Sequence, residues 1–299
     1  MSQTTAVRTN KAQYRLDAAL RAAAMEAFRG NLACPHHRED ELRTLYLDTP
    51  DGELGSRFGY ELSISCFGMP RMAGPVAITL REQIKGAERI HRTCLSFAAA
   101  EEYLSGARAY EDACLDHPLL QGAGRSLDTT ALRAASAIDT CRRRARLLQP
   151  ALLVTCQHAV LVPLRPTADA DAAAVRVTFE RELSVRDLRG DRAAALSPLA
   201  GLADRRFPQA LAGSDDSLMS VEYGAHEPAW LARALSDLGV QPTSFSAYRA
   251  ARRAVGAERR EETDDDLVGP EVGPAHAAPS GRLRFAGFSF LLRTARHAG

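Results

Sequence analysis

Residues 42–51 read LRTLYLDTPD, an apolar and aromatic run that a cluster of turn-forming residues stops. The run predicts a β-strand over 42–47, because leucine, tyrosine and threonine suit a strand and the following Asp-Thr-Pro-Asp-Gly suits a turn. We expect Asp48 to organise this turn ahead of Pro50 rather than to take part in chemistry. Outward from this strand, further apolar or alternating runs predict strands over residues 58–67, 75–83, 89–97, 151–161, 175–185 and 219–223.

Helical spacing of apolar residues separates these strands into groups. It predicts helices over 16–31, over most of 98–146, over 228–238 and from about 246. Polar residues alternate along several strands, and within 175–185 one face is expected to carry Arg176, Thr178, Glu180 and Glu182. This pattern predicts an α+β fold in which an antiparallel sheet has a polar inner face. A closed barrel with a wet lumen produces such a face.

The composition of the 299 residues is that of an ordinary globular protein, with 45% apolar and 25% charged residues. The formal net charge of +1 argues against specific nucleic-acid binding, which needs a generally basic surface. The six cysteines form no CxxC pair, and the first thirty residues contain no continuous apolar run. No stretch approaches the roughly 20 apolar residues of a membrane span. We therefore expect a cytoplasmic protein with reduced thiols.

The composition changes beyond residue 255. Residues 256–299 begin with an acidic charge run and continue with a segment rich in glycine, proline and alanine. Such a segment buries too little apolar surface to order itself, so we expect a flexible linker after a domain over 1–255. The apolar run RLRFAGFSFLLR at 282–293 is interpreted as an edge strand or a short docking segment. The alternative is a peptide that contacts a protein partner or a membrane surface.

Seven segments, in order along residues 8–255, resemble the VTC domain, the polyphosphate polymerase domain of the triphosphate-tunnel superfamily. They are KAQYRL (11–16), LRTLYLDTPD (42–51), the strand 58–68, AITLREQIKGAERIHRTCLS (77–96), PALLVTCQHAVLV (150–162), RVTFERELSV (176–185) and LMSVEYGAHEPAWLARALSDLGVQPTSFSAY (218–248). The resemblance implies an antiparallel β tunnel barrel with helices packed around it. It also implies ATP-dependent transfer of a phosphoryl group onto polyphosphate, with Mn²⁺ or Mg²⁺ as cofactor. Such a lumen must supply arginine, lysine and a metal-binding carboxylate.

Several positions depart from the family pattern. The two arginines of the family motif R-x-R-x-Y fall on Ser63 and Ser65, and its tyrosine falls on Phe67. A serine cannot neutralise a phosphate, so two charge-assisted contacts are lost. The metal-binding glutamate falls on Ser220, and the lysine two residues later falls on Glu222. These departures imply weak or absent turnover.

The remaining polar residues of the motifs are the candidate site. The phosphate-binding candidates are Arg81, Arg92, Arg176, His158, Lys85, Ser246 and Tyr248, and the metal-binding candidates are Glu180 and Glu222. Each has a structural alternative: Arg176 and Glu180 could pair with each other, and His158 could be an interior histidine. Tyr248 could serve packing alone. The basic run at 142–146 is interpreted as a solvated helix face, with contact to a polyanion as the alternative.

Three functions follow from these residues. The first is a degenerate VTC-like domain that binds a phosphorylated polyanion, such as polyphosphate, triphosphate or a nucleotide, with weak or no turnover. The second is a non-catalytic scaffold that uses the tunnel fold for interaction. The third is an active phosphotransferase with a rewired site, in which Glu180 and Glu222 hold the metal and Lys11 and Lys85 supply positive charge. Fold alone does not choose among them, because function depends on the site.

Overall fold

The computed structural model describes residues 10–34, 40–84, 87–119, 127–164, 174–191, 197–206, 209–211 and 216–265. The chain divides into two compact units, Met1–Arg259 and Arg260–Gly299. Of the second unit only residues 260–265 are described, as the end of a helix that begins in the first unit. The segment 282–293 and its predicted docking role lie outside the described residues.

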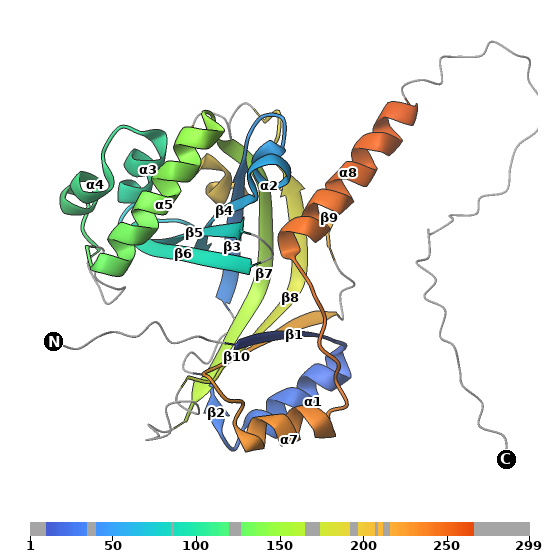
Figure 1. Ribbon diagram of the computed structural model, residues 1–299. Coiled ribbons are helices and arrows are strands. Elements are labelled where there is room, and N and C mark those ends of the chain that lie inside the picture. The colour runs from blue at the N-terminus through green and yellow to red at the C-terminus, as the bar shows by residue number, and fades with distance from the viewer. Residues whose placement is uncertain are drawn as a thin grey trace, which may run out of the picture. The chain divides into compact units, whose positions relative to one another are not determined.

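One antiparallel sheet organises the first unit (Figure 1). Its strand order is β1-β10-β8-β7-β3-β4-β5-β6. The bounds are β1 (Asn10–Leu16), β3 (Asp40–Asp48), β4 (Tyr60–Phe67), β5 (Pro75–Ile84), β6 (Ala87–Ser96), β7 (Gln149–Pro163), β8 (Arg176–Asp187) and β10 (Ser217–Tyr223). Two short strands, β2 (Leu32–Ala33) and β9 (Gln209–Ala210), pair with β7 and β8 respectively.

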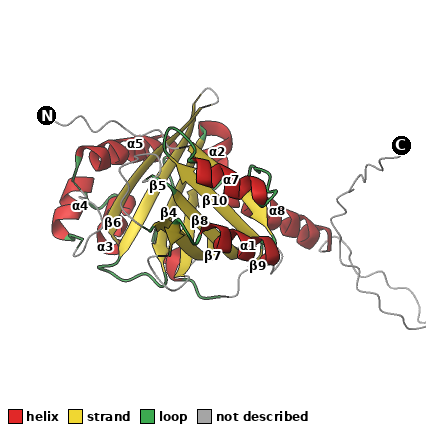
Figure 2. Cartoon of the chain, turned by 90° about the horizontal axis from the view of Figure 1, so that it is seen from below, coloured by secondary structure: helices red, strands yellow, loops and turns green. Residues whose placement is uncertain are grey.

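The sheet is curled (Figure 2), and no ladder between described residues joins β1 to β6. The wall is therefore a half-barrel that is open between these two edge strands. The α+β class and the antiparallel sheet surrounded by helices are confirmed. The helices are α1 (Ala18–Phe28), α2 (Glu53–Phe58), α3 (Phe97–Ser105), α4 (Tyr110–Asp116), α5 (Thr129–Ala145), α7 (Ala229–Asp237), α8 (Ala247–Asp265) and the 3₁₀-helix η2 (Ala200–Ala203).

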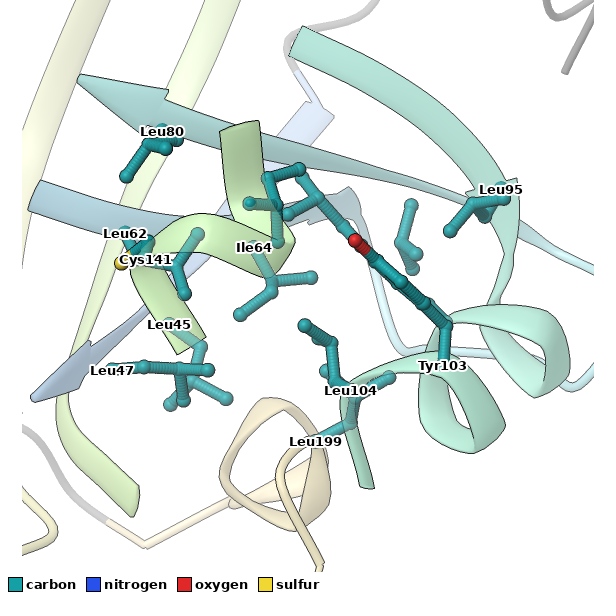
Figure 3. Close-up of a cluster of buried hydrophobic side chains, with 14 of the residues drawn as sticks. Leu45, Leu47, Leu62, Ile64, Leu80, Leu95, Tyr103, Leu104, Cys141 and Leu199 are labelled. Atoms are coloured by element: carbon teal, nitrogen blue, oxygen red, sulfur yellow. The ribbon is translucent and has the colours of Figure 1, made fainter. Parts of the chain in front are cut away.

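Two hydrophobic clusters join the outer face of the sheet to helices. The larger cluster lies between β3–β6 and the helices α3, α4, α5 and η2 (Figure 3). In it, Leu45, Ile64, Leu80 and Ile138 are fully buried, and the Tyr103 hydroxyl donates to the Ala135 carbonyl at 3.0 Å. The second cluster joins β1, β10, β8 and β7 to α1 and α7. Burial of this apolar surface holds the helices of both clusters on one face, whereas α8 packs on the opposite face in a third cluster.

The turn after β3 has the predicted organisation. One carboxylate oxygen of Asp48, Oδ1, accepts hydrogen bonds from the backbone amides of Thr49 and Leu54, each at 2.8 Å. Asp48 is 3% exposed, so its carboxylate satisfies amide groups that have little access to water. The prediction that this residue orders the turn is confirmed.

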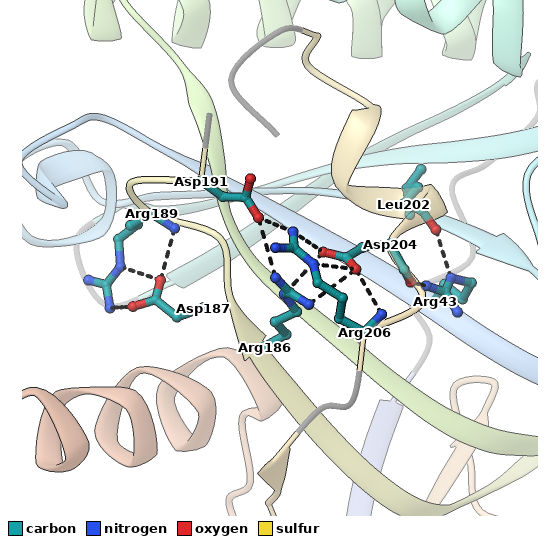
Figure 4. A network of polar contacts seen from close by, with 8 residues as sticks. All are labelled: Arg43, Arg186, Asp187, Arg189, Asp191, Leu202, Asp204 and Arg206. Atoms are coloured by element: carbon teal, nitrogen blue, oxygen red, sulfur yellow. Dashed lines mark hydrogen bonds and ion pairs between the residues drawn. The ribbon is translucent and has the colours of Figure 1, made fainter. Parts of the chain in front are cut away.

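An arginine–aspartate network fixes the segment that follows β8 (Figure 4). Arg186 approaches Asp204 at 3.0 Å and Asp191 at 3.3 Å, and Arg206 donates to both aspartates. The buried Arg43 of β3 donates to the backbone carbonyl of Leu202 at 2.7 Å and to that of Asp204. These contacts hold η2 against the outer face of the sheet.

The last described helix, α8, continues to Asp265, beyond residue 255 where composition predicts a flexible segment. Its sequence is rich in alanine, arginine and glutamate, which have high helix propensity. No described helix is long and apolar enough to cross a membrane.

Candidate functional site

The strand register assigns the candidate residues to one face of the sheet. Residues directly opposite each other on paired strands share a face, so Ser63, Thr79 and Arg92 form one cross-strand row with Tyr46 of β3. A second row links Arg176 of β8 to Glu222 of β10 and Lys11 of β1. We call this side, opposite the helices of the two outer clusters, the inner face. Every candidate on a described strand lies on it: Arg81, Arg92, His158, Arg176, Glu180 and Glu222.

A β-bulge changes the alternation of β8. The pairing of β7 with β8 shifts between Thr155 and Gln157, and Glu182 has a φ of 54°. The bulge places Glu182 and Leu183 opposite the single residue Cys156, and beyond it Val185 and Asp187 of β8 lie on the inner face. The even-numbered alternation predicted from Arg176 to Glu182 therefore ends at this bulge. Glutamate rarely adopts a left-handed φ, so a bulge at this position is not predictable from the residue type.

The middle of the inner face is apolar and covered by α8. Tyr248, Ala251 and Val255 of α8 are buried against Tyr46 of β3, Leu152 and Val154 of β7, and Val185 of β8. The rings of Tyr46 and Tyr248 lie 4.9 Å apart. This packing separates the polar residues of the inner face into two groups. We name them the β5–β6 group (Glu61, Thr79, Arg81, Glu88 and Arg92) and the β8–β10 group (Arg176, Thr178, Glu180, Ser220 and Glu222).

The two groups lie far apart along the strands. The row of Arg92 crosses β3 at Tyr46, and the row of Glu180 crosses β3 at Asp40, six residues away. At about 3.3 Å per residue, six residues span about 20 Å along the strand. Arg81, Arg92 and Arg176 therefore do not converge on one point.

In the β5–β6 group, one arginine is neutralised and one is not. Arg81 Nε lies 3.5 Å from Glu61 Oε1, and Arg81 Nη1 lies 3.3 Å from Glu88 Oε1. Burial raises the pKa of Glu61, while the charges of Arg81 and Arg249 act against that rise. Arg92 is exposed, and no carboxylate of the described chain lies within ion-pair distance of it. Arg92 is thus the available cation of this group.

In the β8–β10 group, too, one cation is paired and one is not, once the neighbouring strand β1 is included. From β1, Lys11 Nζ lies 3.6 Å from Glu222 Oε1, and Gln13 Nε2 donates to Ser220 Oγ at 3.2 Å. Arg176 is exposed opposite Glu222, yet among the described carboxylates none forms an ion pair with it. Glu180 approaches His158 Nδ1 at 3.7 Å rather than Arg176, so the alternative of an Arg176–Glu180 pair is not what the structure shows.

His158 and Phe67 form an aromatic pair between the two groups. His158 is 9% exposed, and its Nδ1 has no hydrogen-bond partner among the described residues. The Phe67 ring lies 5.6 Å from the imidazole at an interplanar angle of 50°, yet Phe67 remains 57% exposed. On the sequence alone, Phe67 is assigned no role and is treated only as the replacement of a motif tyrosine. The feature that could have indicated a role is an aromatic residue on the predicted polar face of a strand.

The acidic candidates do not fit a shared divalent-metal site. Glu222 lies opposite Arg176, four residues along β8 from Glu180, which is about 13 Å along the strand. Glu222 is paired with Lys11, and Glu180 faces His158. Within the described ranges, no three histidine, cysteine, aspartate or glutamate side chains are grouped to hold a metal ion. The described side chains of the inner face therefore form no carboxylate cage for Mg²⁺ or Mn²⁺.

The two candidates at the start of α8, Ser246 and Tyr248, have structural partners. Ser246 Oγ accepts a hydrogen bond from the Arg249 amide at 3.2 Å, as a helix N-cap does. Tyr248 Oη donates to Asp48 Oδ2 at 2.8 Å inside the protein. Lys85 lies outside the described residues.

The basic run of α5 packs on aromatic rings. Arg142 lies over the Tyr103 ring at 5.2 Å, and Arg144 donates to the Tyr60 hydroxyl at 2.5 Å. A cavity of about 440 Å³ lies between the turn before α2 and the end of α5, and Arg57, Arg144 and Arg146 contribute to its wall together with Asp51 and Glu53. Arg57 already pairs with Glu53 at 2.9 Å, so one of these three arginines is neutralised by a residue of the same wall.

No family model and no curated protein matches the chain. Several solved structures are similar to it. A Bacillus halodurans protein provisionally described as an adenylate cyclase has a TM-score of 0.42 and 9% identity, over 79% of this chain and 92% of the other. A Vibrio parahaemolyticus protein with the same provisional description has a TM-score of 0.39 and 9% identity, over 82% and 98%. A provisionally described adenylyl cyclase from Hippeastrum, reported to have dominant triphosphatase activity, has a TM-score of 0.42 and 11% identity, over 82% and 95%.

Proposed function

We propose that the inner face binds a phosphorylated anion through Arg92 and Arg176, with weak or no phosphoryl transfer. One observation carries this proposal. Three other cations of the inner face, Lys11, Arg15 and Arg81, each pair with a carboxylate, whereas Arg92 and Arg176 are exposed and have no such partner in the described structure. An exposed guanidinium can bind a phosphate through two parallel hydrogen bonds.

Each of these arginines has hydroxyl groups beside it. Thr79 lies directly opposite Arg92 on the neighbouring strand, about 5 Å away. Thr178 follows Arg176 on the same face of β8, and Ser220 lies opposite Thr178. A hydroxyl donates one hydrogen bond to a phosphate oxygen without adding charge. Both arginines thus belong to small polar surfaces suited to one or a few phosphate groups.

The proposal of weak turnover rests on the residues that replace the expected catalytic ones. Ser63, Ser65 and Ser220 stand on the inner face where the resemblance implies two arginines and a metal-binding glutamate. The Ser65 hydroxyl is already hydrogen-bonded to Thr44 Oγ1 at 3.0 Å. Phosphoryl transfer depends on electrostatic stabilisation of the transferred group, which these serines cannot supply.

Binding is tested by calorimetric titration of the full chain with tripolyphosphate, ATP and long polyphosphate. We expect Arg92→Gln and Arg176→Gln each to weaken binding of at least one ligand by about 10- to 100-fold, since a charged hydrogen bond contributes about 1.5–3 kcal/mol. Arg89→Gln is the matched control, because Arg89 lies on the same strand as Arg92 but opposite Glu82, on the outer face. Equal affinities of Arg92→Gln, Arg176→Gln and the control would disprove the proposal.

Turnover is tested separately by incubation with ATP and Mn²⁺ or Mg²⁺. Rapid formation of polyphosphate would show that the chain is an active phosphotransferase and that the proposal of weak turnover is wrong. In that case Glu180→Gln and Glu222→Gln identify whether either carboxylate takes part. Loss of activity in both variants would support the rewired site.

A second candidate function is a non-catalytic scaffold. The burial of Tyr248, Ala251 and Val255 on the inner face favours it, because α8 occupies surface that a tunnel enzyme needs for substrate. Absence of any thermal shift with all three ligands would support this candidate over the first.

A further inference from the structure

We infer that Phe67 and His158 form a stacking platform for a planar aromatic base, so that the ligand of the inner face is a nucleotide rather than an inorganic phosphate chain. The inference rests on the proposed function and specifies its ligand. Phe67 and His158 are not among the residues through which the proposed function binds phosphate, which are Arg92 and Arg176.

The exposure of Phe67 is the first observation. Phe67 ends β4, opposite Leu42 of β3, and Leu42 lies opposite Cys156 of β7, so the phenylalanine belongs to the inner face. Its side chain is 57% exposed and belongs to none of the three hydrophobic clusters. A single exposed apolar residue on an outer surface needs no explanation. On a polar inner face that is expected to bind a ligand, an exposed ring offers stacking area.

His158 provides the second observation. Its ring is nine-tenths buried and contacts the Phe67 ring at 5.6 Å, which fixes one side of the phenylalanine. The imidazole Nδ1 has no hydrogen-bond partner among the described residues, since Glu180 Oε1 is 3.7 Å away. This nitrogen is fully buried beside Glu180, so the pair offers a ligand the open face of the Phe67 ring rather than a hydrogen bond. A planar nucleobase presents the ring face that such a platform requires.

The position of the platform relative to the two available arginines is the third observation. Phe67 is four residues from Ser63, which lies in the row of Arg92, and Glu180 beside His158 is four residues from Arg176. Either interval is about 13 Å along a strand. A base on the platform therefore leaves its ribose and phosphates free to extend along the sheet toward one arginine or the other.

The test compares ATP with tripolyphosphate on the wild-type chain, on Phe67→Ala and on the control Ile90→Ala. Ile90 is also apolar, 54% exposed and on the inner face, opposite Arg81. Stacking on an aromatic side chain is expected to make ATP bind about tenfold or more tightly than tripolyphosphate. We expect Phe67→Ala to remove this preference while leaving the affinity for tripolyphosphate unchanged, and Ile90→Ala to retain it. Because the Phe67 side chain is exposed, its truncation should not prevent folding.

The outcomes are distinguishable. Equal affinity of the wild type for ATP and tripolyphosphate would overturn the inference and leave the anion-binding proposal intact. A preference for ATP that survives in Phe67→Ala would show that the base binds elsewhere and would also overturn it. Failure of both ligands to bind would overturn the inference together with the proposed function.

Discussion

The change Tyr248→Phe separates a structural from a ligand-binding role for α8. In the folded chain the Tyr248 hydroxyl donates to Asp48 Oδ2 at 2.8 Å, and the two residues are 7% and 3% exposed. The variant keeps the ring that packs on Tyr46 and removes only the hydroxyl. Asp48 Oδ1 still accepts from the amides of Thr49 and Leu54, so the turn after β3 is retained.

The size of the effect follows from this geometry. A hydrogen bond to a charged group contributes about 1.5–3 kcal/mol, and the variant leaves one carboxylate oxygen without its donor in a site with little water. No cavity the size of a methyl group forms, because phenylalanine fills the same ring space. We therefore expect the free energy of unfolding to fall by about 2 kcal/mol, which lowers the Tm by about 4–8 °C for a domain of this size.

The measurement is urea unfolding of the wild type, Tyr248→Phe, Asp48→Asn and the double variant. The cycle should give a coupling energy of about 1 kcal/mol or more, because the two groups contact each other directly. Tyr103→Phe is a useful control, since its hydroxyl donates to the neutral carbonyl of Ala135, and its loss should cost about 1 kcal/mol.

The same variant should change the response to alkaline pH. Burial, and then the charge and hydrogen bond of Asp48, raise the pKa of Tyr248 above its ordinary value. A group with a raised pKa in the folded state contributes stability that is present below its unfolded pKa, about 10, and is lost as the pH rises above it. Tyr248→Phe should lose less stability than the wild type above pH 10.

Two results would contradict this reasoning. A stability loss below about 0.5 kcal/mol, or additive effects in the double variant, would mean that the hydrogen bond contributes little in solution. Unchanged stability with weaker binding of tripolyphosphate would instead favour the phosphate-binding role predicted for Tyr248 from the sequence.

Three further predictions concern the rest of the fold. Gly201→Ala should lower the free energy of unfolding by about 1–3 kcal/mol in urea titrations. The reason is that the added Cβ would lie 2.5 Å from Leu188 Cδ1 and 2.8 Å from Leu45 Cδ1 in a packed core. An unchanged unfolding midpoint would show that η2 can move away. Alkylation at pH 8 followed by mass spectrometry should label the partly exposed Cys34 before the buried Cys141, since burial raises the pKa of the Cys141 thiol to about 12; equal labelling rates would refute this order. Burial by itself would raise the pKa of Asp204, but hydrogen bonds from Arg206 and the charge of Arg186 hold this pKa below its usual value. The contribution of Asp204 to the stability of the fold is therefore present above about pH 4 and is lost as the pH falls below that. Asp204→Asn should therefore flatten the acid side of the stability curve, and an unchanged slope would argue against the network.

Much of the sheet could be predicted from local sequence. The runs at 42–47, 75–83 and 151–161 all fall within observed strands, and the Asp-Thr-Pro-Asp-Gly turn has the predicted aspartate contacts. The reason is that strand alternation and turn chemistry depend on residues close together in the chain. The same alternation correctly predicted that Arg176, Thr178 and Glu180 share a face.

The candidate site was less predictable, because its contacts join distant parts of the chain. The approach of Glu180 to His158 depends on the register of β7 with β8, and the position of Val185 on the inner face depends on a bulge at Glu182. Neither register nor bulge has a reliable local pattern in a strand whose residues are mostly polar.

The sequence by itself determined the strands, their alternating polar face and the serines at positions 63 and 65. The tertiary structure decided which polar residues remain available. It pairs Arg81 with two glutamates, leaves Arg92 and Arg176 exposed, and brings Tyr248 to Asp48, 200 residues away in the chain. Periodic patterns follow from the backbone geometry of each strand, whereas ion pairs and helix docking follow from which strands pair and in which register.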